Sequence, residues 1–261
     1  MYQDYRIFAI SSRLSTLKLI IPVIGPKGGV GKSTISSMVS LGLSDKSIAT
    51  GLLDLDITNP TLHIILGIDV KSIKLEEVNG IKPLKLTENL EFISPSFFTE
   101  DKALPLRGKD IVNVIRELLA IVNWNSIVLV IDTPPGFSDE VLELLFLIYN
   151  VNPYILRPLL VTNQSILSLV SIKRILHLIR KEITPLGIIC NMCNNDDYIQ
   201  DISRIYNIDN LGYIPFINDI EKIIGDSKAL LKYSTSYLNI LINKILNIIR
   251  LRDVNEDIYN K

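Results

Sequence analysis

The chain alternates short apolar runs, rich in Ile, Leu and Val, with longer segments in which apolar residues recur at helical spacing. Most of the short runs are continuously apolar, which is typical of strands that are covered on both faces. This βαβ rhythm predicts an α/β fold with a doubly wound, mostly parallel sheet and helices on both faces. The predicted strands are 17–24, 49–55, 90–94, 127–132, 154–161, 186–190 and 210–214, and the predicted helices are 32–43, 109–122, 138–148, 165–180, 198–206 and 236–250.

The organisation along the chain is uniform. No internal repeat, low-complexity tract or Pro/Gly/Ser-rich linker interrupts it, and the least regular segment, 67–108, still contains the strand predicted at 90–94. We therefore predict a short N-terminal extension, residues 1–16, followed by a single domain at 17–261.

Composition narrows the class of protein. With 261 residues, 48% of them hydrophobic, the chain can bury a large core and is not intrinsically disordered. Its 27 Lys+Arg and 28 Asp+Glu give a net charge of −1, which argues against a general polyanion binder. No run reaches the roughly 18–20 apolar residues of a membrane span, and residues 1–16 do not read as a signal peptide. A cytoplasmic location is expected.

Histidine and cysteine usage excludes other classes. The histidines are His63 and His177, so a three-His zinc site is excluded. The two cysteines, Cys190 and Cys193, are too few for a disulfide scaffold.

Residues 25–34 read Gly-Pro-Lys-Gly-Gly-Val-Gly-Lys-Ser-Thr, between the predicted strand 17–24 and a predicted helix. This strand–loop–helix setting predicts a phosphate-binding loop, although Pro26 stands where the usual pattern has glycine. Glycines allow successive N–H groups to face one anion, the lysine reaches the β- and γ-phosphates, and the serine hydroxyl can ligate Mg²⁺. The predicted ATP-binding residues of the loop are Lys27, Gly28, Gly29, Val30, Gly31, Lys32, Ser33 and Thr34.

Carboxylates follow two other predicted strands. Alternation places Asp54 and Asp56 on the same side of an extended segment, near the carboxyl end of the sheet. They can serve catalysis there, or they can cap the next helix. Asp132 ends the apolar run 127–131, an arrangement that positions a carboxylate to hold Mg²⁺. Ser33, Asp54 and Asp132 are the candidate magnesium residues.

The segment from Lys27 to Thr34 closely resembles the deviant phosphate-binding loop of MinD, ParA and Mrp proteins. That resemblance implies that Lys27 reaches across a homodimer to the partner's phosphates, that Asp56 polarises the attacking water, and that Asp54 lies near the Mg²⁺ shell. Lys27, Lys32 and Asp56 are thus the candidate catalytic residues. A solvated loop lysine is the other interpretation of Lys27.

Further segments are similar to Mrp-type iron–sulfur carrier ATPases. These segments are residues 132–140, which contain Asp-Thr-Pro-Pro-Gly, together with residues 107–108, Trp124, residues 191–192 and residues 211–215. The resemblance covers about residues 17–249. It implies an Mg²⁺-dependent, slowly hydrolysing ATPase that dimerises with ATP at the interface and serves an apo iron–sulfur client. It also implies that Asn191 and Pro215 contact the adenine.

Cys190 and Cys193 depart from the Mrp pattern. The Mrp type has its Cys-x-x-Cys several residues after Asn-Met, where this chain reads Asn-Asn-Asp-Asp at 194–197. One interpretation is a displaced iron–sulfur site that bridges two subunits. The other is that Cys190 is a buried apolar strand residue and Cys193 is incidental.

A switch ATPase of the MinD or ParA kind, without a cluster, is the alternative function. A MinD-like membrane anchor would be a basic amphipathic helix, but 237–250 is apolar nearly all round and an acidic segment follows. A packed helix, with no membrane partner, is expected. DNA is not expected either, because a solvated helix face explains Lys173, Arg174, Arg180 and Lys181 as well as a basic patch does.

Overall fold

An eight-stranded sheet forms the centre of the molecule, with strand order β3-β4-β2-β5-β1-β6-β7-β8. The computed structural model describes residues 4–99, 105–179 and 181–259. Neighbouring strands are parallel except for β3 and β4, which are antiparallel. The strands are β1 Leu19–Ile24, β2 Thr50–Asp54, β3 Leu84–Thr87, β4 Leu90–Ile93, β5 Val128–Asp132, β6 Leu159–Thr162, β7 Gly187–Asn191 and β8 Asn210–Ile214.

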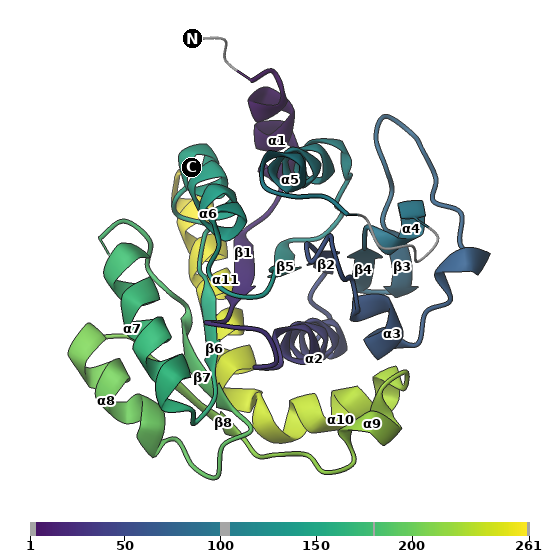
Figure 1. Ribbon diagram of the computed structural model, residues 1–261. Helices are drawn as coiled ribbons and strands as arrows, with labels where there is room; N and C mark the ends of the chain where they lie inside the picture. Colours follow the sequence, from purple (N-terminus) through teal and green to yellow (C-terminus); the bar gives the residue numbers. More distant parts are fainter. Residues whose placement is uncertain (1–3, 100–104, 180, 260–261) are drawn as a thin grey trace.

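Helices cover both faces of the sheet (Figure 1). They are α1 Arg6–Leu14, α2 Lys32–Asp45, α3 Leu62–Leu66, α4 Ser96–Thr99, α5 Lys109–Ile121, α6 Asp139–Val151, α7 Ile166–Ile179, α8 Asp197–Tyr206, α9 Ile220–Ile223, α10 Ser227–Tyr237 and α11 Asn239–Tyr259, with a 3₁₀ turn at Val70–Ser72. One core lies between the sheet and α1, α5, α6, α7 and α8. The other lies between the sheet and α2, α3, α10 and α11. Alternate residues of β1 enter each core, so the strand is apolar throughout.

The predicted parallel, doubly wound fold is confirmed, and each predicted strand is present. The strand predicted at 154–161 begins later, at Leu159, because Pro153 and Pro158 interrupt the ladder and leave only a bridge between Ile20 and Leu156. Edge strand β3 was not predicted, since it has four residues and is half-exposed. The helix predicted at 236–250 is α11, and the preceding α10 was missed.

Helix α1 lies within the segment predicted as a short extension. Ile10 and Leu14 are buried in the same core as Ile20 of β1. Asp4 accepts hydrogen bonds from Arg6 and Arg116, and these hold the pKa of its carboxyl well below the usual range. The helix is thus tied to α5, which carries Arg116, by apolar and ionic contacts. The domain boundary after residue 16 stays a prediction.

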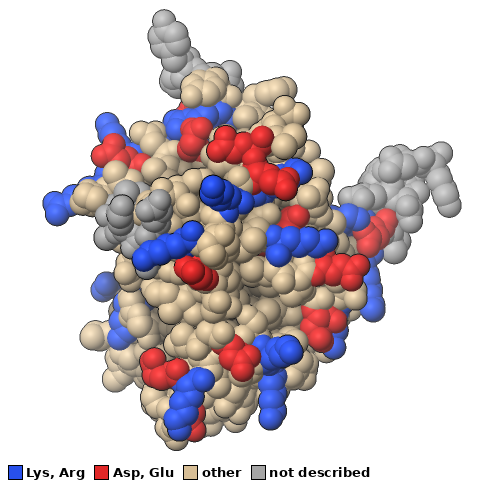
Figure 2. Space-filling view, turned by 90° about the vertical axis from the view of Figure 1, so that its right-hand side faces the viewer, with Lys and Arg blue, Asp and Glu red and all other residues tan. Residues whose placement is uncertain are grey.

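None of the helices among the described residues has the length and hydropathy needed to span a bilayer. Helix α11 buries Leu241, Ile245 and Ile249 in the core, as predicted for a packed C-terminal helix. On the face shown in Figure 2, acidic and basic side chains are interspersed. Of the residues considered for DNA, Lys173, Arg174 and Lys181 are exposed, and Arg180 lies outside the described residues.

Candidate functional site

The phosphate-binding loop connects β1 to α2, as the sequence predicts. Strand β1 lies between β5 and β6 in the middle of the sheet, so the loop leaves from a central position at the carboxyl edge. Gly29 and Gly31 have φ values of 77° and 87°, in the left-handed region where other residues are strained. No atom lies within 4 Å of a Cβ built on Gly29, so the space beside the loop is open. Such turns form the amide nests that bind anions.

Lys32 opens helix α2 at the end of this loop. Its side chain is buried, with 7% exposure, and burial lowers the pKa of the ammonium while Asp132 and Asp56 oppose the shift. The cation is therefore held close to carboxylates in a site largely shielded from water. It is placed to meet an anion bound by the loop.

Asp54 and Asp132 end neighbouring strands and are register partners in the β2–β5 ladder. Both are buried, and burial is the main cause of the raised pKa of each, that of Asp132 to about 6. Asp132 accepts hydrogen bonds from Ser33 and from Ser36, the latter at 3.2 Å. Because carboxylate and hydroxyl oxygens are the donors that Mg²⁺ prefers, this donor set fits the metal.

The Asp54 carboxylate is also fixed by hydrogen bonds. The Ser94 hydroxyl donates to its Oδ2 at 3.0 Å and the backbone N–H of Asp56 donates to its Oδ1 at 3.1 Å. Sequence reasoning missed Ser94, which follows the next strand of the sheet. Its position as the last residue of the strand predicted at 90–94 was the available signal.

Asp56 is half-buried just beyond β2. Its Oδ1 accepts from the backbone N–H of Asn59 at 3.3 Å and from the Thr58 hydroxyl at 3.4 Å. Burial raises the pKa of Asp56, and the Lys32 charge opposes that shift. The carboxylate thus caps a turn and at the same time faces the phosphate lysine. The next helix, α3, begins after Thr61 and neither Asp54 nor Asp56 caps it, so the helix-cap interpretation is wrong. The catalytic role of Asp56 stays a prediction.

Lys27 lies on the exposed side of the loop. Its Nζ is 3.5 Å from the hydroxyl of Ser165, which precedes α7. The ammonium is therefore at the surface, where a second subunit could meet it. The dimer contact itself stays a prediction.

A pocket of about 50 Å³ lies beside the loop at the carboxyl ends of β7 and β8. Its walls include the predicted residues Asn191 and Pro215, together with Phe216, a 63%-exposed aromatic side chain that sequence reasoning missed. The Asn191 amide donates from Nδ2 to the Val30 carbonyl at 2.9 Å. The same nitrogen is 2.2 Å from a Cβ built on Gly31, so a side chain there would displace the Asn191 amide, and the φ of 87° favours glycine as well. The Asn191 side chain therefore fixes the position of the loop through its hydrogen bond to Val30.

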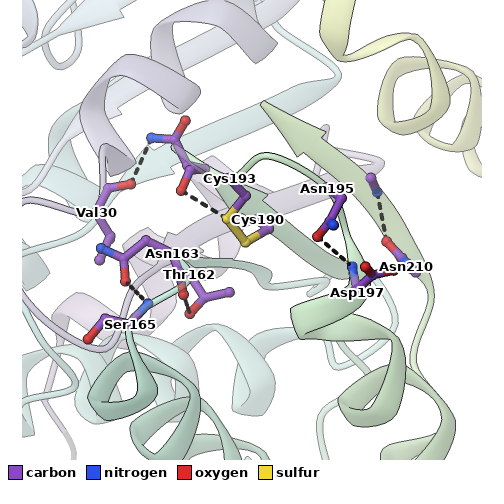
Figure 3. The surroundings of a disulfide bond; sticks show 11 residues. Val30, Thr162, Asn163, Ser165, Cys190, Cys193, Asn195, Asp197 and Asn210 are labelled. Atoms are coloured by element: carbon purple, nitrogen blue, oxygen red, sulfur yellow. Dashed lines mark hydrogen bonds between the residues drawn. A yellow bond between two sulfur atoms is a disulfide. The ribbon is translucent and has the colours of Figure 1, made fainter. Parts of the chain in front are cut away.

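Cys190 and Cys193 are joined in a disulfide, with 5.8 Å between their Cα atoms (Figure 3). Both side chains are fully buried in the core on the α7 and α8 side of the sheet. Within the described ranges, no group of three or more His, Cys, Asp or Glu side chains could hold a metal ion. In this conformation the sulfurs are out of reach of a second subunit. Their role as cluster ligands stays a prediction, and it requires reduction and exposure of the pair.

Curated relatives cover much of the chain. An iron-sulfur cluster carrier protein of Rickettsia typhi is 34% identical over 238 residues, which are 89% of this chain and 71% of the relative. A cytosolic Fe-S cluster assembly factor NUBP2 homolog of Monosiga brevicollis is 32% identical over 187 residues, 70% of this chain. The matched part spans 65% of the length of the Monosiga protein.

Solved structures share the fold. A nucleotide-binding protein of Archaeoglobus fulgidus in complex with ADP has a TM-score of 0.72 at 21% identity, over 89% of this chain and 96% of that one. The cell division ATPase MinD of Pyrococcus furiosus has a TM-score of 0.63 at 20% identity, over 89% and 100%. The model of the NUBPL iron-transfer P-loop NTPases matches residues 16–249. The predicted resemblance to Mrp-type ATPases is thereby confirmed, and the chain belongs to the NUBPL iron-transfer P-loop NTPase family.

Proposed function

We propose that this chain is an Mg²⁺-dependent, slowly hydrolysing ATPase that dimerises around ATP and carries iron–sulfur clusters to apo client proteins. The observation that carries the ATPase part is the convergence of an open glycine loop, a buried lysine and two buried carboxylates at one edge of the sheet. The family match and the names of the curated relatives support the carrier part. The word cytosolic in the Monosiga name supports a cytoplasmic location.

ATP would bind with its phosphates in the loop of residues 25–34. Lys32 would neutralise the β- and γ-phosphates, and its burial strengthens that interaction because water screens it weakly. Asn191 and Pro215 would contact the adenine in the adjacent pocket. Ser33, Asp132 and Asp54 would hold the metal. When bound, Mg²⁺ neutralises phosphate charge.

Hydrolysis would depend on Asp56 and Lys27. The Asp56 carboxylate, fixed by its turn and facing the loop lysine, would orient the attacking water. The exposed Lys27 would supply positive charge to the phosphates bound by the other subunit, which would make turnover depend on dimerisation.

The cluster would be cargo, held by Cys190 and Cys193 of both subunits, since two thiolates cannot complete four-coordinate iron. The buried disulfide favours the alternative, a switch ATPase without a cluster. Asn191 lies between the two cysteines in the sequence and contacts the phosphate-binding loop. A structural change at the two cysteines would therefore be transmitted through Asn191 to the nucleotide site.

Anaerobic reconstitution with iron and sulfide after reduction separates the two functions. We expect wild-type protein to bind iron and to show a charge-transfer absorption spectrum, and the Cys190→Ala/Cys193→Ala variant to bind none. Alanine is used because a buried hydroxyl would be costly. ATP binding by both proteins is the control for folding. Equal iron near zero in both would discard the carrier function and leave the switch ATPase.

A further inference from the structure

A second pocket lies at the edge of the sheet opposite the phosphate-binding loop. It has a volume of about 550 Å³ and is lined in part by residues at the amino ends of three parallel strands: Arg157 two residues before β6, Leu186 directly before β7 and Asp209 directly before β8. Helices α8 and α11 both contact β8, and they contribute Tyr206 and Lys244 with Ile248 to the pocket walls. Because the loop lies at the carboxyl ends of the strands, this pocket is separate from the proposed ATP site.

Two cations lie in this pocket. Arg157 is half-buried and Lys244 of α11 is 26% exposed. Burial lowers the pKa of both side chains, and the Arg157 charge lowers that of Lys244 further. Two like charges therefore lie close together, and each makes the charged form of the other side chain less favourable.

Asp209 balances only one of these charges. Its carboxylate forms an ion pair with Lys244. Arg157 donates from one guanidinium nitrogen to the carbonyl of Leu156 at 2.8 Å, and among the described residues it meets no carboxylate. A guanidinium has five N–H donors, so most of its hydrogen-bonding capacity remains for a ligand.

The rest of the lining is mixed. Apolar surface comes from Pro185, Leu186, Ile208 and Ile248, beside the ring of Tyr206, while Thr184 and Asn207 add polar groups. Small-molecule sites have volumes of several hundred Å³ and combine apolar walls with a few convergent polar groups. This pocket has such a volume, with apolar and polar lining in similar shares. The fork of an arginine matches phosphate and carboxylate groups in geometry as well as in charge.

We propose that this pocket binds a small organic anion, with its phosphate or carboxylate group on Arg157 and Lys244 and its apolar part against Pro185, Ile208 and Ile248. The ligand neutralises the charge that the protein leaves unpaired, and its apolar part removes the pocket walls from water. The site is independent of ATP binding.

Phenyl phosphate is a suitable probe, because it combines the anionic group with an apolar ring. By calorimetry we expect a Kd of about 1 mM or lower, the order that a few charge-assisted hydrogen bonds and one ring give. Inorganic phosphate should bind more weakly, and phenol should not bind measurably. A parallel titration with benzoate distinguishes phosphate from carboxylate selectivity.

Variants locate the site. Arg157→Gln should weaken phenyl phosphate binding at least about tenfold, and Arg157→Lys, which keeps the charge and loses the fork, should weaken it less. Arg250→Gln, on the exposed side of α11 outside the pocket, is the matched control. Lys32→Ala should leave this binding intact. Absence of binding to wild type, or binding lost in Lys32→Ala and kept in Arg157→Gln, would overturn the proposal.

Discussion

Asp54 and Asp132 are register partners, each the last residue of its strand in the β2–β5 ladder. Both carboxyl groups are buried, and the pKa of each is raised. Folding thus places two carboxylates together where ionisation of either one disfavours ionisation of the other. Such a pair makes the stability of the nucleotide-free protein sensitive to pH. It also makes the binding of a divalent cation between the two carboxylates favourable.

Stability of the nucleotide-free protein should therefore depend on the ionisation of Asp132. Its pKa is about 6 when folded against 3.8 as the ordinary value, so folding favours the protonated form. The contribution to stability is fully present below about pH 4 and is lost as the pH rises through about 6. Melting temperatures of wild type and Asp132→Asn, measured from pH 5 to 8, should diverge with rising pH in favour of the variant. Parallel curves would contradict the raised pKa. Mg²⁺ with ADP should reduce the difference.

Lys32→Ala should weaken ATP binding by about 100-fold or more, because it removes a charge-assisted contact of about 3 kcal/mol from a site shielded from water. Calorimetry with ATP and Mg²⁺ measures the change. Lys46→Ala, at the exposed far end of the same helix, is the control, and its ATP affinity should match that of wild type. An unchanged affinity in Lys32→Ala would remove the loop from the proposed ATP site.

Asp56→Ala and Lys27→Ala should both lose hydrolysis, for different reasons. Without the Asp56 carboxylate, ATP affinity should stay near wild type, turnover should fall about 10²–10⁴-fold, and the ATP-bound dimer should accumulate. Without Lys27, the dimer itself should weaken. Phosphate release and analytical ultracentrifugation with ATP separate the two outcomes. An Asp56→Ala protein that stays monomeric and still hydrolyses ATP would contradict water activation by this residue.

The fold and the arrangement of the candidate phosphate site could be predicted because their signals are local. Lys32 and the loop glycines are consecutive, and Asp54 and Asp132 each follow a continuous apolar run, so a parallel sheet brings them to one edge. The order of the strands and the placement of Ser94 on Asp54 depend on contacts between segments far apart in the chain.

Other features carried no local signal. In the sequence, Arg157 lies inside the strand predicted at 154–161. Its proximity to Lys244 in one pocket exists only after α11 packs against the sheet. Cysteine spacing left Cys190 and Cys193 open to two interpretations, and it did not indicate a buried disulfide. Helix α1 was missed because a nine-residue amphipathic segment becomes stable only through its contacts with α5.

The contact between Asn191 and Gly31 gives a last prediction. A Cβ at position 31 would lie 2.2 Å from Asn191 Nδ2, and the backbone there has a φ of 87°. Gly31→Ala should therefore lower the free energy of unfolding by about 2–4 kcal/mol, of which backbone strain accounts for about 1–2. Asn191→Ala alone should cost about 1 kcal/mol, through loss of its hydrogen bond to Val30.

The double variant Gly31→Ala/Asn191→Ala removes the clash between the Cβ and the Asn191 amide and keeps the backbone strain at position 31. Urea unfolding of all four proteins should show the double variant to be more stable than the sum of the single effects predicts, by about 1 kcal/mol or more. Strict additivity would contradict the contact between the Asn191 amide and position 31.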